Sequence, residues 1–165
     1  MKTAIILLLT GMLSIAAYSQ EIVLNQNEDM EKNKQEVLSY LKDCGVYFIA
    51  TEEENQPRVR PFSSCEIVDG QLVILTGKVK DVYKQIAKNP CVELCAMNPS
   101  GMEWIRISAT LVPVESKKAK DAFLELNPSA KRTYSSTDDN MILFALTNAT
   151  ARIKSFSSPE RTIRF

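Results

Sequence analysis

The chain has 165 residues, which is the length of one domain and enough to bury a hydrophobic core. Lys plus Arg and Asp plus Glu both total 20, so no net positive charge attracts nucleic acid or an anionic membrane, and any anion site must be a local cluster. The sequence contains no His, which excludes a Cys/His metal site, His-based catalytic triads and His-ligated haem; we expect no metal site.

The first 19 residues predict a secretory signal peptide. Lys2 gives a positive start, residues 4–17 form an apolar run, and the small residues Ala17 and Ser19 fit cleavage before Gln20. The run is short for a membrane span, although an uncleaved N-terminal anchor is the alternative. We therefore expect an exported bacterial protein, periplasmic or secreted, with no stable membrane insertion after cleavage.

A single domain is expected over residues 29–165, after a polar linker over residues 20–28. Apolar spacing predicts a helix over residues 29–42, and Gly45 suits the left-handed position that ends a helix. The further expected elements follow in chain order: strand 46–51, an acidic turn 52–55, strand 56–68, a tight Asp-Gly turn 69–70, strand 71–76, helix 77–89, strand 91–98, strand 103–114, helix 115–128, strand 141–157 (long enough to bend or split) and a short edge strand in the tail.

Short antiparallel strands with a few helices between them predict an α+β fold, a small barrel of about six strands with flanking helices. Four cysteines lie within it. If export oxidises them, three pairings are possible, and the alternative is that they stay free as small apolar residues. They are Cys44, Cys65, Cys91 and Cys95.

The stretch "PRVRPF" (57–62) carries the clearest chemical signal. In a strand, Arg58 and Arg60 point to the same side, about 7 Å apart, and two guanidiniums that close suggest a bound anion. The alternative is that they pair with Glu52–Glu54 across the turn, as surface arginines often do.

A second segment, "LTGKVKDVYKQ" (75–85), strengthens the anion hypothesis. Thr76 ends a strand, and Lys78 and Lys80 precede or open a helix, whose first N–H groups attract anions. If this segment lies beside 57–62, the joint cluster suits one doubly charged phosphomonoester.

Four stretches together resemble one family, the pyridoxamine 5′-phosphate oxidase-like proteins of the FMN-binding split β-barrel superfamily. The similarity covers residues 29–165 and is strongest to small stand-alone members related to nitroimidazole-resistance reductases. The stretches are "GVYFIATEEENQPRVRPFS", "DGQLVILTGKVKDVYKQIAKNPCVELCAMNPSGMEWIRISATLV", "AKDAFLELNPSAKRTYSS" and "ATARIKSFSSPERTIRF".

The resemblance implies a split barrel that forms a homodimer with two FMN sites at the subunit interface. Arg58 and Arg60 would contact the FMN phosphate and ribityl chain, with Val59 and Pro61 beside the flavin ring. Thr76, Lys78 and Lys80 would close over the phosphate, and Trp104 and Arg106 would lie near the flavin of their own or the partner subunit. For Trp104, a core aromatic at the dimer interface is the alternative.

The predicted function is that of an FMN-binding flavoprotein, an oxidoreductase of pyridoxamine 5′-phosphate oxidase-like type acting on a small molecule. The flavin would supply the redox chemistry, and no residue stands out as a catalytic acid or base. The alternative is a non-catalytic split-barrel protein that binds flavin, haem or another planar ligand.

Overall fold

The computed structural model describes the backbone of residues 2–165 and the side chains of residues 20–165. The signal peptide predicted over residues 1–19 lies outside the residues whose side chains are described. Within the described part, no helix is long and apolar enough to cross a membrane. The chain divides into two compact units, residues 1–32 and residues 33–165.

Helix α1 (Lys2–Cys44) makes up the described part of the first unit, and its last residues belong to the second. It is continuous through residues 20–28, where the sequence predicts a linker, so the helix begins well before the expected start at Asp29. The predicted end is confirmed: Gly45 has a backbone φ of 72°, and its N–H closes the last turn of the helix.

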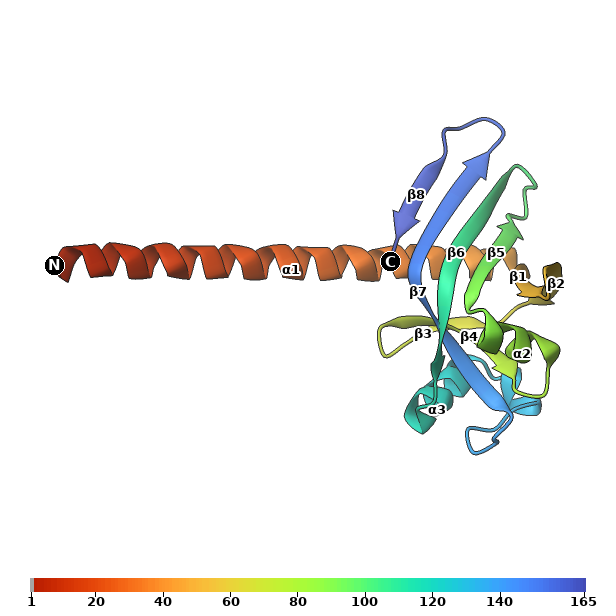
Figure 1. Ribbon diagram of the computed structural model, residues 1–165. Helices are drawn as coiled ribbons and strands as arrows, with labels where there is room; N and C mark the ends of the chain where they lie inside the picture. The colour runs from red at the N-terminus through yellow and green to blue at the C-terminus, as the bar shows by residue number, and fades with distance from the viewer. Residues whose placement is uncertain (1) are drawn as a thin grey trace. The chain divides into compact units, whose positions relative to one another are not determined.

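The second unit is built on one antiparallel sheet of eight strands in the order β2-β1-β5-β6-β7-β4-β3, with β8 paired to β7 (Figure 1). The α+β fold is confirmed, with eight strands where about six were expected. The strands are β1 (Tyr47–Glu53), β2 (Gln56–Phe62), β3 (Cys65–Val68), β4 (Gln71–Gly77), β5 (Cys91–Met97), β6 (Glu103–Val114), β7 (Met141–Ser155) and β8 (Arg161–Arg164); the other helices are α2 (Asp81–Lys88), α3 (Lys117–Leu126) and the 3-10 helix η1 (Ala130–Arg132).

The sheet curls because β2 and β3, its two ends, are consecutive in the chain. Only Ser63 and Ser64 join them, and so short a link spans about 11 Å at most. The two ends must therefore lie close together although β2 and β3 do not pair, which makes an open, split barrel. The sequence predicted a single strand over residues 56–68. The chain instead breaks at the two serines, where the Tyr47 hydroxyl donates a hydrogen bond to the Ser64 carbonyl at 3.0 Å.

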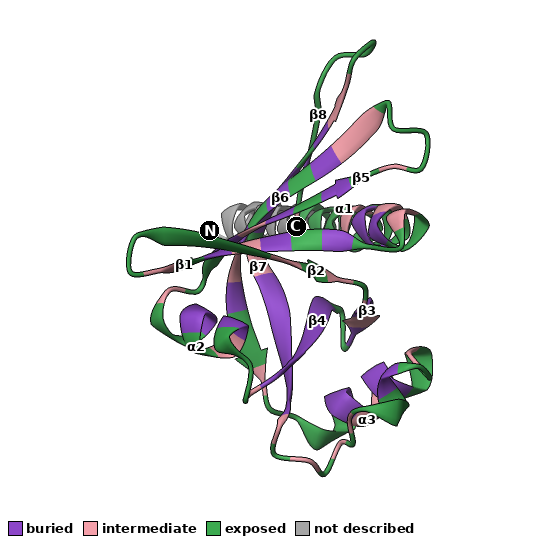
Figure 2. Cartoon of the chain, turned by 90° about the vertical axis from the view of Figure 1, so that its right-hand side faces the viewer, coloured by how far each residue is buried: buried purple, intermediate pink, exposed green. Residues whose placement is uncertain are grey.

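Two hydrophobic cores lie on the opposite faces of β4 and the first half of β7 (Figure 2). The barrel core holds Ile74 and Phe144, and it is covered by α2 and by the part of α1 after residue 32. The second core holds Leu75 and Leu143 under α3. Strands buried on both faces need unbroken apolar runs, which accounts for the sequences "LVIL" and "MILFAL".

Strand β7 bends where it changes neighbours. Its first half pairs with β4 and its second half with β8, and the register to β6 shifts between Ser108 and Thr110. Opposite this shift Asn148 has a φ of 49°, a left-handed conformation that Asn tolerates better than most residues. The predicted bend in this long strand is thus confirmed.

Helix α2 begins at Asp81, four residues later than predicted. Residues 77–80 form a turn in which the Lys80 N–H donates to the Gly77 carbonyl at 3.0 Å. The Lys78 N–H instead donates to the carbonyl of Asn140 at 2.8 Å, so this amide is committed outside the helix. Helix α3 begins as expected, with the Ser116 side chain accepting from the Ala119 N–H.

We expect Phe123→Ala to lower the free energy of unfolding by about 3–5 kcal/mol, because Phe123 is fully buried between α3 and the second core. Leu126→Ala, on the same helix but 54% exposed, is the matched control and should change it by less than about 0.5 kcal/mol. Denaturant unfolding measures both. Equal losses in the two variants would contradict the packing described for α3.

Candidate functional site

Arg60 lies on β2 at the edge of the sheet, held by neutral oxygen atoms. Its guanidinium donates to Thr51 Oγ1 and to Gln85 Oε1, both at 2.6 Å, and also contacts the carbonyls of Ile49 and Arg58. Thr51 and Gln85 are buried and are themselves hydrogen-bonded at 2.6 Å. Burial and the neighbouring Arg58 charge lower the pKa of Arg60. Its positive charge is thus fixed in place, and among the described side chains no carboxylate binds it.

Arg58 is bound differently, to a carboxylate. Its Nε and a terminal nitrogen lie 2.9 and 2.7 Å from Glu53 Oε2, across the β1–β2 turn. Hydrogen bonds from Arg58 and Gln85 lower the pKa of Glu53. The ion pairing expected as the alternative to an anion site therefore holds for Arg58 and not for Arg60.

A cleft of about 530 Å³ joins these arginines to the start of α2. Lys80 is the N-cap residue of α2, and within the part of the chain whose side chains are described its side chain makes no capping hydrogen bond. The first turn of α2 therefore keeps the partial positive charge of a helix N-terminus. The cleft contains three cations and two carboxylates, a net charge of +1. Its lining residues are Glu53, Arg58, Arg60, Lys80, Asp81, Val82 and Gln85.

A second cleft, of about 280 Å³, lies at the split of the barrel and shares Lys80 with the first. It is formed by the end of β2, the link to β3 and the segment around η1, and it is rich in hydroxyl groups. The Lys80 ammonium lies 5.9 Å from the centre of the Tyr134 ring. The lining residues are Pro61, Phe62, Ser63, Ser64, Leu75, Lys80, Ser129, Ala130, Thr133 and Tyr134.

The turn that presents Lys80 is fastened by Asn140. The Asn140 carbonyl accepts from the Lys78 N–H at 2.8 Å, and its side-chain Oδ1 accepts from the Val79 N–H at 3.1 Å. Gly77 sits directly against this residue: a Cβ there would lie 2.9 Å from Asn140 Oδ1 and 3.2 Å from the Tyr134 hydroxyl. Only glycine fits this position without movement of its neighbours.

Of the residues predicted for the site, the structure brings together Arg58, Arg60 and Lys80 in the first cleft, and Pro61 and Lys80 in the second. Thr76 is buried nearby on β4, and its hydroxyl has no hydrogen-bond partner in the described part of the chain. Lys78 points elsewhere, 3.6 Å from Glu115.

Val59, Trp104 and Arg106 lie on a different surface, the outer face of the sheet. Val59 alternates with the arginines and is 63% exposed on the opposite side of β2. Trp104 stacks on Phe156 with ring centres 5.3 Å apart, and Arg106 binds Glu93 at 2.6 Å. Within one chain these three residues are not part of either cleft.

Sequence reasoning missed the neutral groups that hold Arg60. Thr51 follows Tyr47 and Ile49 on the buried face of β1, and Gln85 stands between Val82 and Ile86 on the buried face of α2. A polar residue on an otherwise apolar face needs a partner, so both were detectable signals. The residues around η1 that line the second cleft have no such polar residue on an apolar face to mark them in the sequence.

All four cysteines are free in the structure. Cys65 is buried, which raises its pKa to about 12, whereas Cys91 and Cys95 are exposed. Within the part of the chain whose side chains are described, no three His, Cys, Asp or Glu side chains are grouped to hold a metal ion.

The open antiparallel barrel and its cationic cleft place the chain in the class of split-barrel proteins. The family described as pyridoxamine 5′-phosphate oxidase matches residues 33–155, about three quarters of the sequence. The chain therefore belongs to the pyridoxamine 5′-phosphate oxidase-like family. No curated protein matches it significantly.

Solved structures support the same assignment. A NimC/NimA family protein from Clostridium acetobutylicum is 33% identical, with a TM-score of 0.82 over 86% of this chain and 98% of that one. A pyridoxamine 5′-phosphate oxidase-related, FMN-binding protein from Nostoc punctiforme is 16% identical, with a TM-score of 0.52 over 80% and 84%. A haem-binding protein from Mycobacterium smegmatis is 14% identical, with a TM-score of 0.59 over 82% and 57%. At these low identities the last two show the fold alone.

We expect Gly77→Ala to lower the free energy of unfolding by about 1–3 kcal/mol, because the added methyl displaces the Asn140 side chain. The loss should be smaller when the same change is made in an Asn140→Ala background, where most of the obstruction is gone. Thermal or denaturant unfolding of the four proteins of this cycle measures the coupling. Additive effects would show that Asn140 does not fasten the turn.

Proposed function

We propose that the chain is an FMN-binding flavoprotein whose first cleft binds the FMN phosphate. The observation that carries this proposal is Arg60, a partly buried guanidinium held by neutral oxygens and facing the same cleft as Arg58 and Lys80 at the start of α2. A phosphomonoester offers three acceptor oxygens and a double negative charge, which matches two guanidiniums, an ammonium and a helix N-terminus. The donor set therefore fits the phosphate of FMN.

The second cleft supports the rest of the assignment. Because Lys80 lines both clefts, a ligand whose phosphate sits beside Arg60 can extend toward Pro61 and the split of the barrel. Hydroxyl groups there suit a polyol or a ring that carries carbonyl and nitrogen acceptors. The FMN-binding neighbour from Nostoc punctiforme, which has the same fold, supports FMN as that ligand.

The chemistry we propose is oxidation or reduction of a small molecule. Bound flavin supplies the electron transfer, while residues of this chain bind its phosphate and limit its access to water. A non-catalytic role as a carrier of a planar ligand is the second candidate, because a haem-binding protein shares the fold. A phosphate-binding donor set and the lack of His favour FMN over haem. Turnover of a quinone or nitro compound by the reduced protein would separate the enzyme from the carrier.

We also propose that the chain forms a homodimer through the outer face of the sheet. Exposed apolar side chains gather there: Phe48, Val59 and Met97 are 48–63% exposed, and Phe48 pairs directly with Cys95 across the strands. With Trp104 they lie on neighbouring strands of one sheet face, and apolar side chains gathered in this way are typical of a subunit contact. A second copy of the chain would cover this face.

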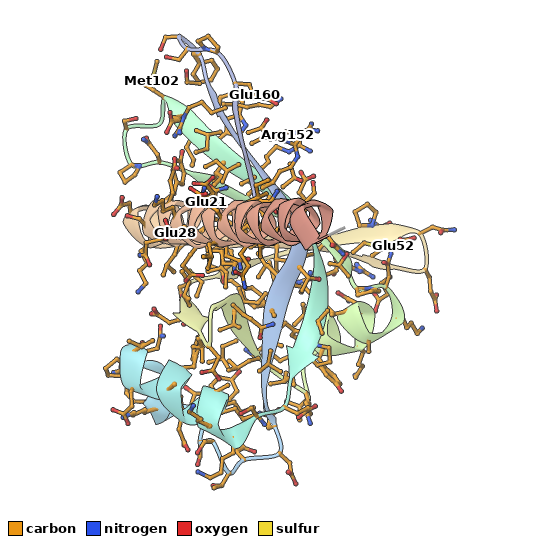
Figure 3. All side chains as sticks on the ribbon, turned by 90° about the vertical axis from the view of Figure 1, so that its left-hand side faces the viewer. Glu21, Glu28, Glu52, Met102, Arg152 and Glu160 are labelled. Atoms are coloured by element: carbon orange, nitrogen blue, oxygen red, sulfur yellow. The ribbon has the colours of Figure 1, made fainter. Side chains whose placement is uncertain are left out.

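The distribution of charge on the outer face also supports a second copy of the chain as the partner there. The outer face carries acidic residues at the β1–β2 turn, among them Glu52. On β7 and β8 it carries the cations Arg152, Lys154 and Arg164, of which the first two share one carboxylate, Glu160, so this end keeps an excess of positive charge (Figure 3). Two copies related by a two-fold axis can set the acidic end of one against the basic end of the other. Such a dimer would also bring Trp104 and Arg106 of one subunit toward the partner subunit.

FMN titration followed by flavin fluorescence tests the cofactor. Wild type should bind FMN more tightly than riboflavin, and Arg58→Ala/Arg60→Ala should weaken FMN binding at least about tenfold, since each lost charge-assisted hydrogen bond costs about 1.5–3 kcal/mol. Lys117→Ala/Lys118→Ala removes the same charge from the exposed side of α3 and should leave binding unchanged. Equal affinity for FMN and riboflavin would overturn the phosphate site.

Light scattering after size-exclusion chromatography tests the dimer. The purified chain should have about twice the mass of one chain, and Phe48→Glu should shift it to the monomer because the new carboxylate would be buried without a partner. Leu126→Glu, at a similarly exposed apolar residue on α3, should remain dimeric. A wild-type monomer at micromolar concentration would refute this interface.

A further inference from the structure

We infer that Glu53 sets the charge preference of the anion cleft by competing with the ligand phosphate for Arg58. This inference rests on the proposed phosphate site and concerns a residue with no role in the proposal above. It makes Glu53 a specificity-determining residue: its carboxylate weakens the binding of doubly charged ligands.

Glu53 occupies the donor positions that a phosphate would use. One carboxylate oxygen, Oε2, accepts a hydrogen bond from Arg58 Nε at 2.9 Å and lies 2.7 Å from a terminal nitrogen of the same guanidinium. The other oxygen, Oε1, faces the Gln85 side-chain amide at 3.4 Å, and Gln85 also binds Arg60. The carboxylate is therefore inside the cationic cluster and in contact with its framework.

The Glu53–Arg58 pair can open at little cost. The two side chains are 41% and 49% exposed, and ion pairs of that exposure contribute little to stability. Arg60 differs, because it is fixed by the buried Thr51 and Gln85. The cleft thus contains one arginine, Arg60, that is held by neutral groups, and another, Arg58, that stays paired with a carboxylate until a ligand displaces it.

The other carboxylate of the cleft is not an equivalent competitor. Asp81 binds Lys84 at 2.9 Å, one turn along the exposed side of α2. No contact with an arginine is found for it in the described part of the chain. Glu53 is the carboxylate in direct contact with Arg58, although the Arg58 charge also contributes to lowering the pKa of Asp81. The cleft's net charge of +1 becomes +2 when Glu53 is neutral.

This charge count has a consequence for ligands. A phosphomonoester dianion leaves the cleft at −1 with Glu53 charged and at zero with Glu53 neutral. The affinity for a neutral ligand does not depend on the charge of Glu53 in this way. Glu53 could instead have a positioning role, in which its carboxylate holds Arg58 in the orientation that binds phosphate. Removing the Glu53 charge would then weaken phosphate binding. The sign of the effect distinguishes the two roles.

Glu53→Gln keeps the shape of the side chain and removes its charge. We expect the variant to bind FMN about three- to fivefold more tightly than wild type at low ionic strength, with riboflavin binding unchanged. Glu54→Gln is the matched control: it makes the same charge change one residue further along the turn, at an exposed position, and should alter FMN binding less than twofold. Unchanged or weaker FMN binding by Glu53→Gln would overturn the inference.

A second probe separates this inference from the proposed function. Inorganic phosphate should raise the melting temperature of wild type, and raise that of Glu53→Gln more. One outcome is that wild type binds FMN through its phosphate while Glu53→Gln shows neither tighter FMN binding nor a larger melting-temperature shift with inorganic phosphate. In that case only the role assigned to Glu53 is wrong. If folded wild type responds to neither FMN nor inorganic phosphate, there is no anion site and both proposals fail.

Discussion

The structure depends on the two-residue link between the ends of its sheet. Because β2 and β3 occupy opposite ends of the strand order and only Ser63 and Ser64 separate them, the sheet has to curl until those ends meet. The ends meet without pairing, and the two serines that join them line the second cleft together with the segment around η1. The link that makes the sheet curl therefore also shapes the opening into which we propose that the ligand extends.

Within this frame, neutral side chains organise the charged ones. The Arg60 guanidinium is held by the side chains of Thr51 and Gln85 and by two backbone carbonyls, all of them neutral, so its position is fixed without an ion pair. The turn that carries Lys80 is likewise fastened by an amide, that of Asn140. A preorganised guanidinium of this kind can bind an anion without first losing a carboxylate partner. Arg60 meets this condition, whereas Arg58 must first give up Glu53.

Local patterns made most of the fold predictable. The Asp69-Gly70 turn and the start of α3 are set by neighbouring residues, and both lie where the sequence pattern indicated. The break after Phe62 was not predictable, because residues 56–68 are equally suited to one strand or two, and only long-range pairing with β1 and β4 decides. The start of α2 was missed for the same reason, since Asn140 lies far along the chain.

The candidate site was predictable in its cations and not in their partners. The strand period placed Arg58 and Arg60 on one side, and the strand-to-helix turn placed Lys80 near them. Which arginine would find a carboxylate depends on turn geometry and on Gln85 from another element, and a linear pattern contains neither. Val59, by contrast, was assigned to the flavin through family resemblance, and within one chain it lies on the outer face.

The central position of β7 has a consequence for how the protein folds. Residues 141–145 pair with β4, whose partner positions 73–77 are synthesised far earlier. Contacts between residues so distant in sequence form slowly, because a long loop must close before they contribute. Until β7 arrives, the apolar edge of β4 is unpaired in a growing chain, and such edges associate with other chains. The pairing of β7 with β4 completes both cores, and it is thus also the folding step at which aggregation competes.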